Sequence, residues 1–152
     1  MALFRVPRVT EYALRSLGCL ARSGQRMSVR EISELEHIHA ASLAKVLQLL
    51  CWHNLVRSQR GRRGGFWLAR PPEDIRLKDV MEVFQGPFED AANPSEPGFS
   101  AAWERVCAST REALETLTLA DLLRFEAGHE LPLALTVASS SGARHRPSRR
   151  RA

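Results

Sequence analysis

The sequence predicts a mainly α-helical fold that contains one two-stranded β-hairpin and ends in a long C-terminal helix. Three observations support this fold class. Apolar residues recur at helical spacing through most of residues 8–125. An arginine- and glycine-rich turn separates two short β-prone runs near residue 60. Helical periodicity is lost after residue 127. At 152 residues with 44% hydrophobic content, the chain suits one domain with an appendage.

The first predicted helix covers residues 8–22. Ser23-Gly24 ends it, because glycine accepts the left-handed backbone geometry found at helix C-termini. Ser28 and Glu31 have the spacing of a capping box, which opens a second helix over residues 29–37. The buried side of this second helix is expected to hold Val29, Ile32 and Leu35.

The third helix begins at Ala40 and carries two distinct faces. One face is apolar, with Leu43, Val46, Leu47 and Leu50. The opposite face carries Ala41, Lys45 and Gln48, small or polar groups that can meet a partner. Asn54 follows this helix at a position suited to a left-handed backbone. Two short helices joined by a tight turn predict a helix-turn-helix.

A basic hairpin follows the helix-turn-helix. Leu55 and Val56 open one extended run, residues 61–65 turn the chain, and Phe66 starts the return. A helix followed by such a hairpin is the shape of a winged helix, which reads duplex DNA. Pro71-Pro72 ends strand pairing, and a short amphipathic helix around residues 75–85 completes a winged helix-turn-helix domain over residues 1–85.

Residues 86–99 are rich in proline, glycine and acidic side chains, and they predict an exposed loop. Residues 100–127 predict a long helix to about residue 116 and a short terminal helix capped by Thr118. Their apolar stripe follows a domain that is already complete, so a dimer interface is expected. Packing on the chain's own first helix is the alternative. The expected interface residues are Trp103, Val106, Cys107, Thr110, Ala113, Leu114 and Leu117.

The charge is unevenly distributed along the chain. Residues 1–70 carry 12 Lys and Arg against 4 Asp and Glu, whereas residues 71–127 carry 5 against 12. The basic first half favours a polyanionic partner. Residues 128–152 predict a disordered basic tail, whose arginines strengthen non-specific phosphate binding or are simply a solvated terminus.

The expected DNA-binding residues lie on two elements and one helix cap. On the third helix, lysine suits guanine and glutamine suits adenine, and on the wing arginine suits a narrow minor groove. Serine at the cap of the second helix lies near backbone N–H groups that bind phosphate, although capping alone explains it equally well. The predicted set is Ser28, Ser42, Lys45, Gln48, Arg60, Arg62 and Arg63.

The sequence gives little support for other chemistry. His37, His39, Cys51 and His53 lack zinc-ligand spacing, so no metal site is predicted. Neither a phosphate loop nor a catalytic triad is recognisable, so an enzyme is not expected. Three widely spaced cysteines and the lack of a long apolar run predict a cytoplasmic protein that is not inserted in a membrane. Cys107 near a dimer crossing is a candidate for an intersubunit disulfide or a redox sensor.

At these residues the chain resembles the Rrf-two family of winged-helix transcription regulators. The matching segments are TEYALRSLGCLA, SVREISELEHI, the run from Ser42 to Gly86 and, more loosely, WERVCASTREALETLTLADLL. The resemblance covers roughly residues 6–125. It implies a homodimer with one winged helix per subunit and a long C-terminal helix that crosses its partner. It supports Arg60 most directly, because an arginine before the wing glycine recurs in the family, whereas Arg62 and Arg63 replace residues that are more often glycine or proline.

Several family members bind an iron–sulfur cluster through three cysteines that lie before the long helix. Here the corresponding segment contains neither cysteine nor histidine. The ligand positions implied by alignment on Trp103 fall near Gln85, Ala91, Pro97 and Ser100. Glu11 matches a position where some members supply a carboxylate ligand, but clusters need mostly cysteine thiolates. No cofactor is therefore expected.

The sequence thus predicts a homodimeric, sequence-specific transcription regulator that binds double-stranded DNA without an iron–sulfur cluster. The alternative is a protein-interaction module that takes its regulatory signal from a partner protein, suggested by the acidic loop and by Trp52, which is an unusual residue at its position. RNA binding through the basic tail is a further option.

Overall fold

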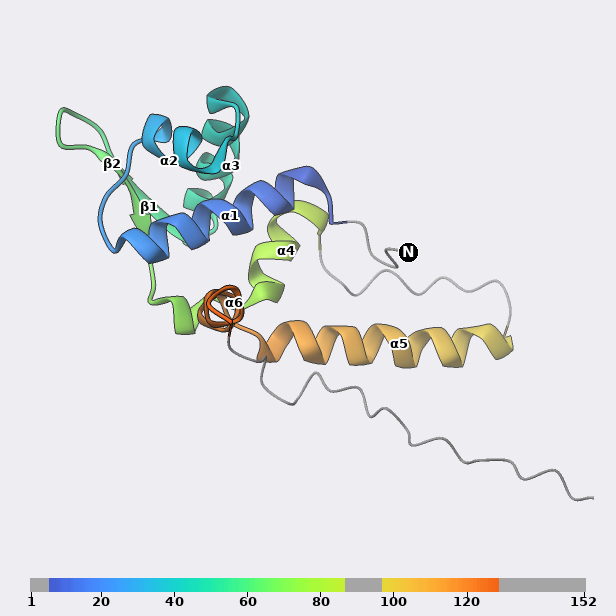
Figure 1. Cartoon of the computed structure of the whole chain (residues 1–152). Helices are drawn as coiled ribbons and strands as arrows, with labels where there is room; N and C mark the ends of the chain where they lie inside the picture. The colour runs from blue at the N-terminus through green and yellow to red at the C-terminus, as the bar shows by residue number, and fades with distance from the viewer. Residues whose placement is uncertain (1–5, 87–96, 129–152) are drawn as a thin grey trace, which may run out of the picture.

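The computed structural model describes residues 6–86 and 97–128, with the backbone only for residues 97–104, 106 and 107. It confirms the mainly α-helical class with one two-stranded antiparallel sheet (Figure 1). In chain order the elements are α1 (Arg8–Ser23), α2 (Val29–Glu36), α3 (Ala40–Trp52), β1 (Val56–Gln59), β2 (Gly65–Leu68), the 3-10 helix η1 (Pro72–Asp74), α4 (Leu77–Gln85), α5 (Pro97–Thr116) and α6 (Leu119–Glu126).

The helix ends follow the expected local chemistry. Gly24 ends α1 with a left-handed backbone at φ 63°. Ser28 caps α2 in a capping box, because its hydroxyl accepts from the Glu31 N–H while the Glu31 carboxylate accepts from the Ser28 N–H. Asn54 takes the left-handed position after α3 at φ 55°. A difference occurs at α2, which ends at Glu36 because His37 adopts the left-handed cap at φ 52°.

A third backbone segment extends the hairpin. β1 and β2 pair antiparallel from Val56 opposite Leu68 to Gln59 opposite Gly65. Met27, just before α2, forms a bridge to Phe66 on the other side of β2. Gly65 has φ 148°, and a Cβ there would lie 2.9 Å from the Met27 carbonyl oxygen, so this close approach requires glycine.

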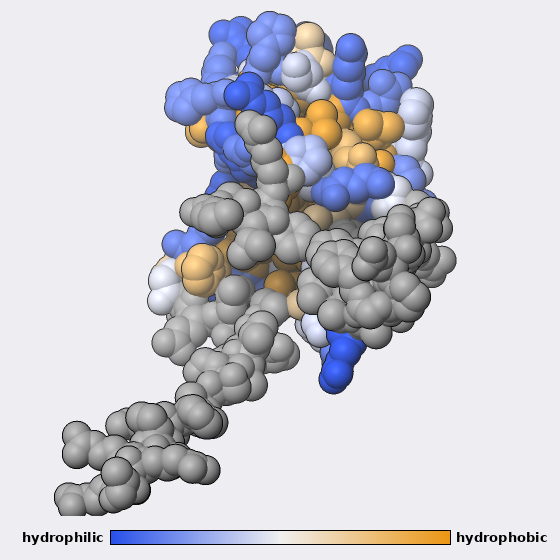
Figure 2. All heavy atoms as spheres, turned by 90° about the vertical axis from the view of Figure 1, so that its right-hand side faces the viewer, coloured by the Kyte–Doolittle hydropathy of each residue, from blue (hydrophilic) through white to orange (hydrophobic). Residues whose placement is uncertain are grey.

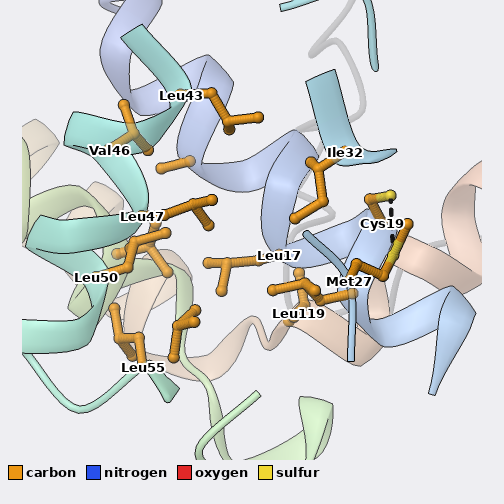
Figure 3. Close-up of a cluster of buried hydrophobic side chains, with 14 of the residues drawn as sticks. Leu17, Cys19, Met27, Ile32, Leu43, Val46, Leu47, Leu50, Leu55 and Leu119 are labelled. Atoms are coloured by element: carbon orange, nitrogen blue, oxygen red, sulfur yellow. Dashed lines mark hydrogen bonds between the residues drawn. The ribbon is translucent and has the colours of Figure 1, made fainter. Parts of the chain in front are cut away.

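The core lies where α1, α2 and α3 meet (Figure 3). Leu17 of α1, Ile32 of α2 and Leu47 of α3 are fully buried there. Leu119 at the start of α6 also enters this cluster, so a helix distant in sequence contributes to the core of the winged domain. Cys19 is buried, with its thiol 3.8 Å from the Met27 sulfur.

One sequence expectation about burial is wrong, and one predicted interface residue is already buried within its own chain. Leu35 was expected inside, but its side chain is 64% exposed, because the short α2 directs only Ile32 fully into the core. Leu117 was expected at a dimer interface, but it is buried within its own chain, where its carbonyl accepts the Leu77 N–H at 2.9 Å. For α6, the packing on the chain's own first helix that was the alternative is what the structure shows.

Ion pairs connect α6 and α2 through α1. Arg22 donates to Glu36 of α2 and to Glu126 of α6, both at 2.8 Å. Arg15 donates to the Glu36 carboxylate at 3.2 Å and to the Glu36 carbonyl oxygen. These residues are largely exposed except for Glu36, so each pair contributes little by itself, but together they fix the relative positions of three helices.

α5 contacts the rest of the chain near its C-terminal end and extends away from the body over the rest of its length (Figure 1). It begins at Pro97, earlier than the predicted start near Ser100. Lys78 of α4 donates to Glu115 of α5 at 2.6 Å, which anchors the contacting end. Most of the predicted loop 86–99 and of the predicted tail 128–152 lies outside the described residues. None of the helices within residues 6–86 and 97–128 combines the length and the hydropathy that crossing a membrane requires.

Candidate nucleic-acid interface

The exposed face of α3 is one stripe that runs the length of the helix. Ala41, Lys45, Gln48 and Trp52 recur at intervals of four, three and four residues, so their side chains project in nearly the same direction. All four are exposed. Ser42 is exposed in the first turn of the same helix. The structure therefore presents Ser42, Lys45 and Gln48 to solvent, as the sequence predicts.

The opposite face of α3 fixes the helix in the domain. Leu43, Val46, Leu47 and Leu50 are between 0% and 3% exposed. Burying four such side chains stabilises the position of α3 by several kcal/mol (roughly 1.5–3 kcal/mol each). The polar stripe is consequently carried on a rigid element. Hydrophilic side chains predominate at the height of α2 and α3 on the face shown in Figure 2, with apolar residues between them.

The wing turn carries three exposed arginines. Gly61 and Gly64 close the turn with a backbone hydrogen bond of 2.9 Å, and Arg62 and Arg63 occupy its tip. Gly61 has φ 113°, and a Cβ at Gly64 would collide with the Gln59 carbonyl oxygen. The glycines therefore serve the turn geometry, and the turn in turn places Arg60, Arg62 and Arg63 in solvent.

Arg26 supports the hairpin of the wing, and the sequence did not predict this role. Its guanidinium lies 4.4 Å from the centre of the Trp67 ring, and its Nη1 donates to Gln59 Oε1 at 2.5 Å. One side chain from the loop before α2 thus contacts both strands of the hairpin. The cation–π contact is worth about 0.5–1 kcal/mol at such a surface site. Nothing local in the sequence indicates this pairing, because it depends on the tertiary approach of Met27 to β2.

A hollow of about 660 Å³ separates α3 from the wing. We call it the α3–wing hollow. Gln48, Cys51 and Trp52 line it from α3, Ser58, Arg60 and Phe66 line it from the hairpin, and Ser28 and Val29 line it from the start of α2. Of the seven predicted DNA-binding residues, the structure brings Ser28, Gln48 and Arg60 around this one space. Burial raises the pKa of the Cys51 thiol, and a hydrogen bond with Ser58 opposes that shift.

Ser28 has a different local role from the one that direct phosphate contact would need. Its hydroxyl donates to Glu31 Oε2 at 2.7 Å and accepts from the Glu31 N–H at 3.2 Å. The Ser28 backbone N–H, which also donates to the Glu31 carboxylate, is the main cause that holds the pKa of that carboxyl below its ordinary value, and the Ser28 hydroxyl adds to it. The hydroxyl is thus engaged in the capping box, so an anion at the start of α2 would meet the backbone around Val29 rather than the serine side chain.

The predicted dimer residues divide into three groups. Leu117 is buried in its own chain, as described above. Thr110, Ala113 and Leu114 are half-buried on α5. The side chains of Trp103, Val106 and Cys107 lie outside the described residues.

The helix-turn-helix of α2 and α3, followed by the arginine-bearing hairpin, defines a winged helix-turn-helix, the class of domain that regulators use to bind duplex DNA. Comparison with known proteins assigns the class more narrowly. Residues 6–124 match the Rrf2 family, described as iron-dependent transcriptional regulators. The chain belongs to the Rrf2 family, and it is a DNA-binding transcription regulator.

Individual relatives agree with this assignment. An HTH-type transcriptional regulator of Mycobacterium tuberculosis strain H37Rv is 33% identical over 140 residues, which covers 84% of each chain. Among solved structures, CymR of B. subtilis superposes with a TM-score of 0.74 at 25% identity, covering 81% of this chain and 98% of CymR. IscR of T. potens gives a TM-score of 0.69 at 29% identity, covering 84% of this chain and 93% of IscR.

The family description raises the question whether this chain can hold iron. Residues 85–103 contain neither cysteine nor histidine. Cys19 is in the core and Cys51 is beside the wing, and burial raises the pKa of both thiols, which disfavours the thiolate that iron binds. Glu11 is paired with Arg15 at 3.4 Å. Among the described residues, no three His, Cys, Asp or Glu side chains gather to hold a metal ion. These residues do not fit an iron–sulfur cluster.

Proposed function

We propose that this protein acts as a homodimeric regulator that binds two DNA half-sites without an iron–sulfur cluster. In each subunit α3 lies in the major groove and the wing reaches the adjacent minor groove. The observation that carries the proposal is the arrangement of two elements on either side of the α3–wing hollow. One is α3, with one face buried in the core and the opposite face exposed; the other is the arginine-bearing turn of the wing. No carboxylate lines that hollow, which suits a polyanion.

The two elements divide the work of recognition. Ser42 and Lys45 lie in the first half of α3, the part of a recognition helix that faces base edges. Gln48 stands one turn further on, beside the hollow. Arg62 and Arg63 at the wing tip supply positive charge to phosphates or to a narrow minor groove, where sequence discrimination is weaker.

The homodimer is supported by the geometry of α5. A helix of 20 residues that contacts its own domain mainly at one end leaves much of its surface to be covered by a partner. A second copy is the partner that a twofold DNA site requires. Thr110, Ala113 and Leu114 lie on this helix, and the predicted roles of Trp103, Val106 and Cys107 stay predictions.

The absence of a cluster is proposed from the donor set described above, and a regulatory rather than enzymatic role is proposed from the family. Because duplex DNA is the proposed target and the relatives are bacterial regulators, we place the protein in the cytoplasm. A protein partner as the source of the regulatory signal also stays a prediction, and co-purification from the source cell tests it. Recovery of the protein alone would count against that partner.

Three measurements test the proposal. A duplex selected from random DNA by the wild-type protein should bind with an affinity that falls steeply as salt increases. Light scattering should give the mass of two chains in solution and of two chains per bound duplex. A visible spectrum of protein purified without oxygen should show no absorption from iron–sulfur charge transfer. Failure to bind any duplex at low salt would refute the DNA-reading role, and a brown absorbing protein would refute the cluster-free role.

A further inference from the structure

Trp52 has no structural role that explains its position. Its side chain is 70% exposed, which makes it the most exposed large apolar residue of the described chain. It does not belong to the core cluster. It does continue the stripe of Lys45 and Gln48 on α3, and it borders the α3–wing hollow. An exposed indole at such a place indicates contact with something outside the chain.

The distance along α3 indicates which part of a duplex Trp52 meets. Trp52 lies eleven residues after Ala41, which is about 16 Å along the helix axis at 1.5 Å per residue. The major groove of B-DNA is about 12 Å wide. When the N-terminal half of α3 faces base edges, the C-terminal end therefore lies at the wall of the groove. That wall is a sugar–phosphate strand.

The position of the wing leads to the same strand. A major groove and the neighbouring minor groove are separated by one sugar–phosphate backbone. With α3 in one groove and the wing tip in the other, that backbone must cross the space between them, which is the α3–wing hollow. The hollow offers Arg60 to phosphate, together with the backbone at Val29 in the first turn of α2, because the Ser28 N–H already donates to Glu31. Trp52 offers an apolar surface that suits the C–H edge of deoxyribose.

We propose that the α3–wing hollow seats the DNA backbone strand between the two grooves, and that Trp52 packs its indole against a deoxyribose of that strand. This inference rests on the DNA-reading mode proposed above. Trp52 then fixes how far α3 advances into the groove, and it contributes equally to every sequence because each nucleotide carries the same sugar.

The test compares three variants with the wild-type protein. Trp52→Ala removes the indole, Trp52→Phe keeps an aromatic ring, and Leu35→Ala is a matched control that removes an exposed apolar side chain outside the hollow. The probes are the duplex selected by the wild-type protein and an unrelated duplex of equal length. Thermal unfolding checks that each variant is folded, which the exposure of both side chains predicts.

Trp52→Ala should bind both duplexes about tenfold more weakly, which corresponds to about 1.4 kcal/mol. The salt dependence should be unchanged, because tryptophan neutralises no phosphate. Trp52→Phe should recover most of the affinity and Leu35→Ala should match the wild type. Hydroxyl-radical cleavage, which reports exposure of deoxyribose, should show that Trp52→Ala loses protection at sugars between the major-groove and minor-groove contacts and keeps protection elsewhere.

Several outcomes would overturn the inference. Wild-type affinity in Trp52→Ala, or an unchanged cleavage pattern, would show that the indole does not pack on the strand. A loss confined to the selected duplex would assign Trp52 to base reading instead. Loss in Leu35→Ala of the same size would show a general effect of surface apolar residues. If the wild-type protein protects no duplex at all, the proposed function fails, and that result is distinct from each of these.

Discussion

Met27 and Phe66 exchange two backbone hydrogen bonds, from the Met27 N–H to the Phe66 carbonyl at 2.9 Å and from the Phe66 N–H to the Met27 carbonyl at 2.7 Å. Met27 immediately precedes the cap of α2, and Phe66 belongs to β2. The pair therefore joins the helix-turn-helix to the wing through the backbone, so their relative position does not depend on side-chain packing alone. Several consequences can be measured.

Gly65→Ala should separate the wing from the helix-turn-helix. The added Cβ would lie 2.9 Å from the Met27 carbonyl oxygen, at a backbone φ of 148°. Gly61→Ala is the control, because it has a strained φ of 113° but meets nothing within 4 Å. Strain of this kind costs about 1–3 kcal/mol, so in urea unfolding Gly61→Ala should lose that amount and Gly65→Ala clearly more. Equal losses would show that the bridge adjusts without cost.

Lys45→Ala and Arg62→Ala should weaken DNA binding in different ways. Lys45 faces base edges in the proposed mode, so its loss should reduce discrimination between sequences by about 1–3 kcal/mol. Arg62 lies on the wing tip, so its loss should weaken all duplexes similarly and lower the salt slope by about one. Titrations of selected and unrelated duplexes at several salt concentrations distinguish the two. The assignment of roles fails if the two variants behave alike.

Leu119→Ala should strongly destabilise the winged domain, although residue 119 is far from that domain in sequence. Leu119 is 1% exposed within the core cluster, and truncation of a buried leucine costs about 2–5 kcal/mol. Phe125→Ala on the same helix is the control, because its ring is 55% exposed and should change stability by less than about 1 kcal/mol. Chemical unfolding monitored by circular dichroism measures both. A small loss in Leu119→Ala would contradict the observed packing of α6.

Glu31 should make a contribution to stability that is lost in acidic solution. Its pKa is lowered by the N–H and hydroxyl of Ser28. A lowered folded-state pKa gives stability that is present above the ordinary glutamate pKa of about 4.3 and is lost as the pH falls through the folded value. Glu31→Gln keeps a capping-box side chain without the charge. The stability difference between wild type and Glu31→Gln should be constant above about pH 5 and shrink below about pH 4. A difference independent of pH would exclude this contribution.

Cys19 and Cys51 should react slowly with alkylating reagents at neutral pH. Burial is the main cause of the raised pKa of both thiols, so both stay protonated and only the thiolate is nucleophilic. In a Cys107→Ser variant, the rate should rise only in clearly alkaline solution. The same variant in urea, where burial is lost, should react faster at pH 8. Rapid reaction of the folded protein at neutral pH would show that one thiol is activated.

Features set by short stretches of sequence were predictable. The caps at Gly24, Ser28 and Thr118, the left-handed Asn54 and the two faces of α3 each depend on residues within one or two turns. The exposed candidates on α3 and on the wing followed from helical phase and from turn chemistry for the same reason.

Features set by tertiary contact were not predictable. Leu35 has the right helical phase for burial, but no neighbouring element covers it. Leu117 was assigned to a partner because its stripe follows a complete domain, whereas the chain returns and buries it with Leu77 and Leu119. Arg26 contacts Trp67 only because Met27 pairs with β2. Each of these depends on which segments meet in space.

Because α5 is held mainly at its C-terminal end, a small tilt at that end displaces its other end much further. Its C-terminal end is fixed by the Lys78–Glu115 ion pair and by the hydrogen bond from Leu77 to Leu117, while about 27 Å of helix, from Glu115 back to Pro97, extends beyond that fixed end. A tilt of about 10° at the fixed end moves the Pro97 end of α5 by about 5 Å. This displacement exceeds the 3.4 Å rise of one base pair. In a dimer joined along such helices, a small change in the angle between the two helices shifts the two winged helix-turn-helix domains relative to each other by more than one base-pair step of the duplex. A signal that alters only this angle would switch binding without touching a DNA contact.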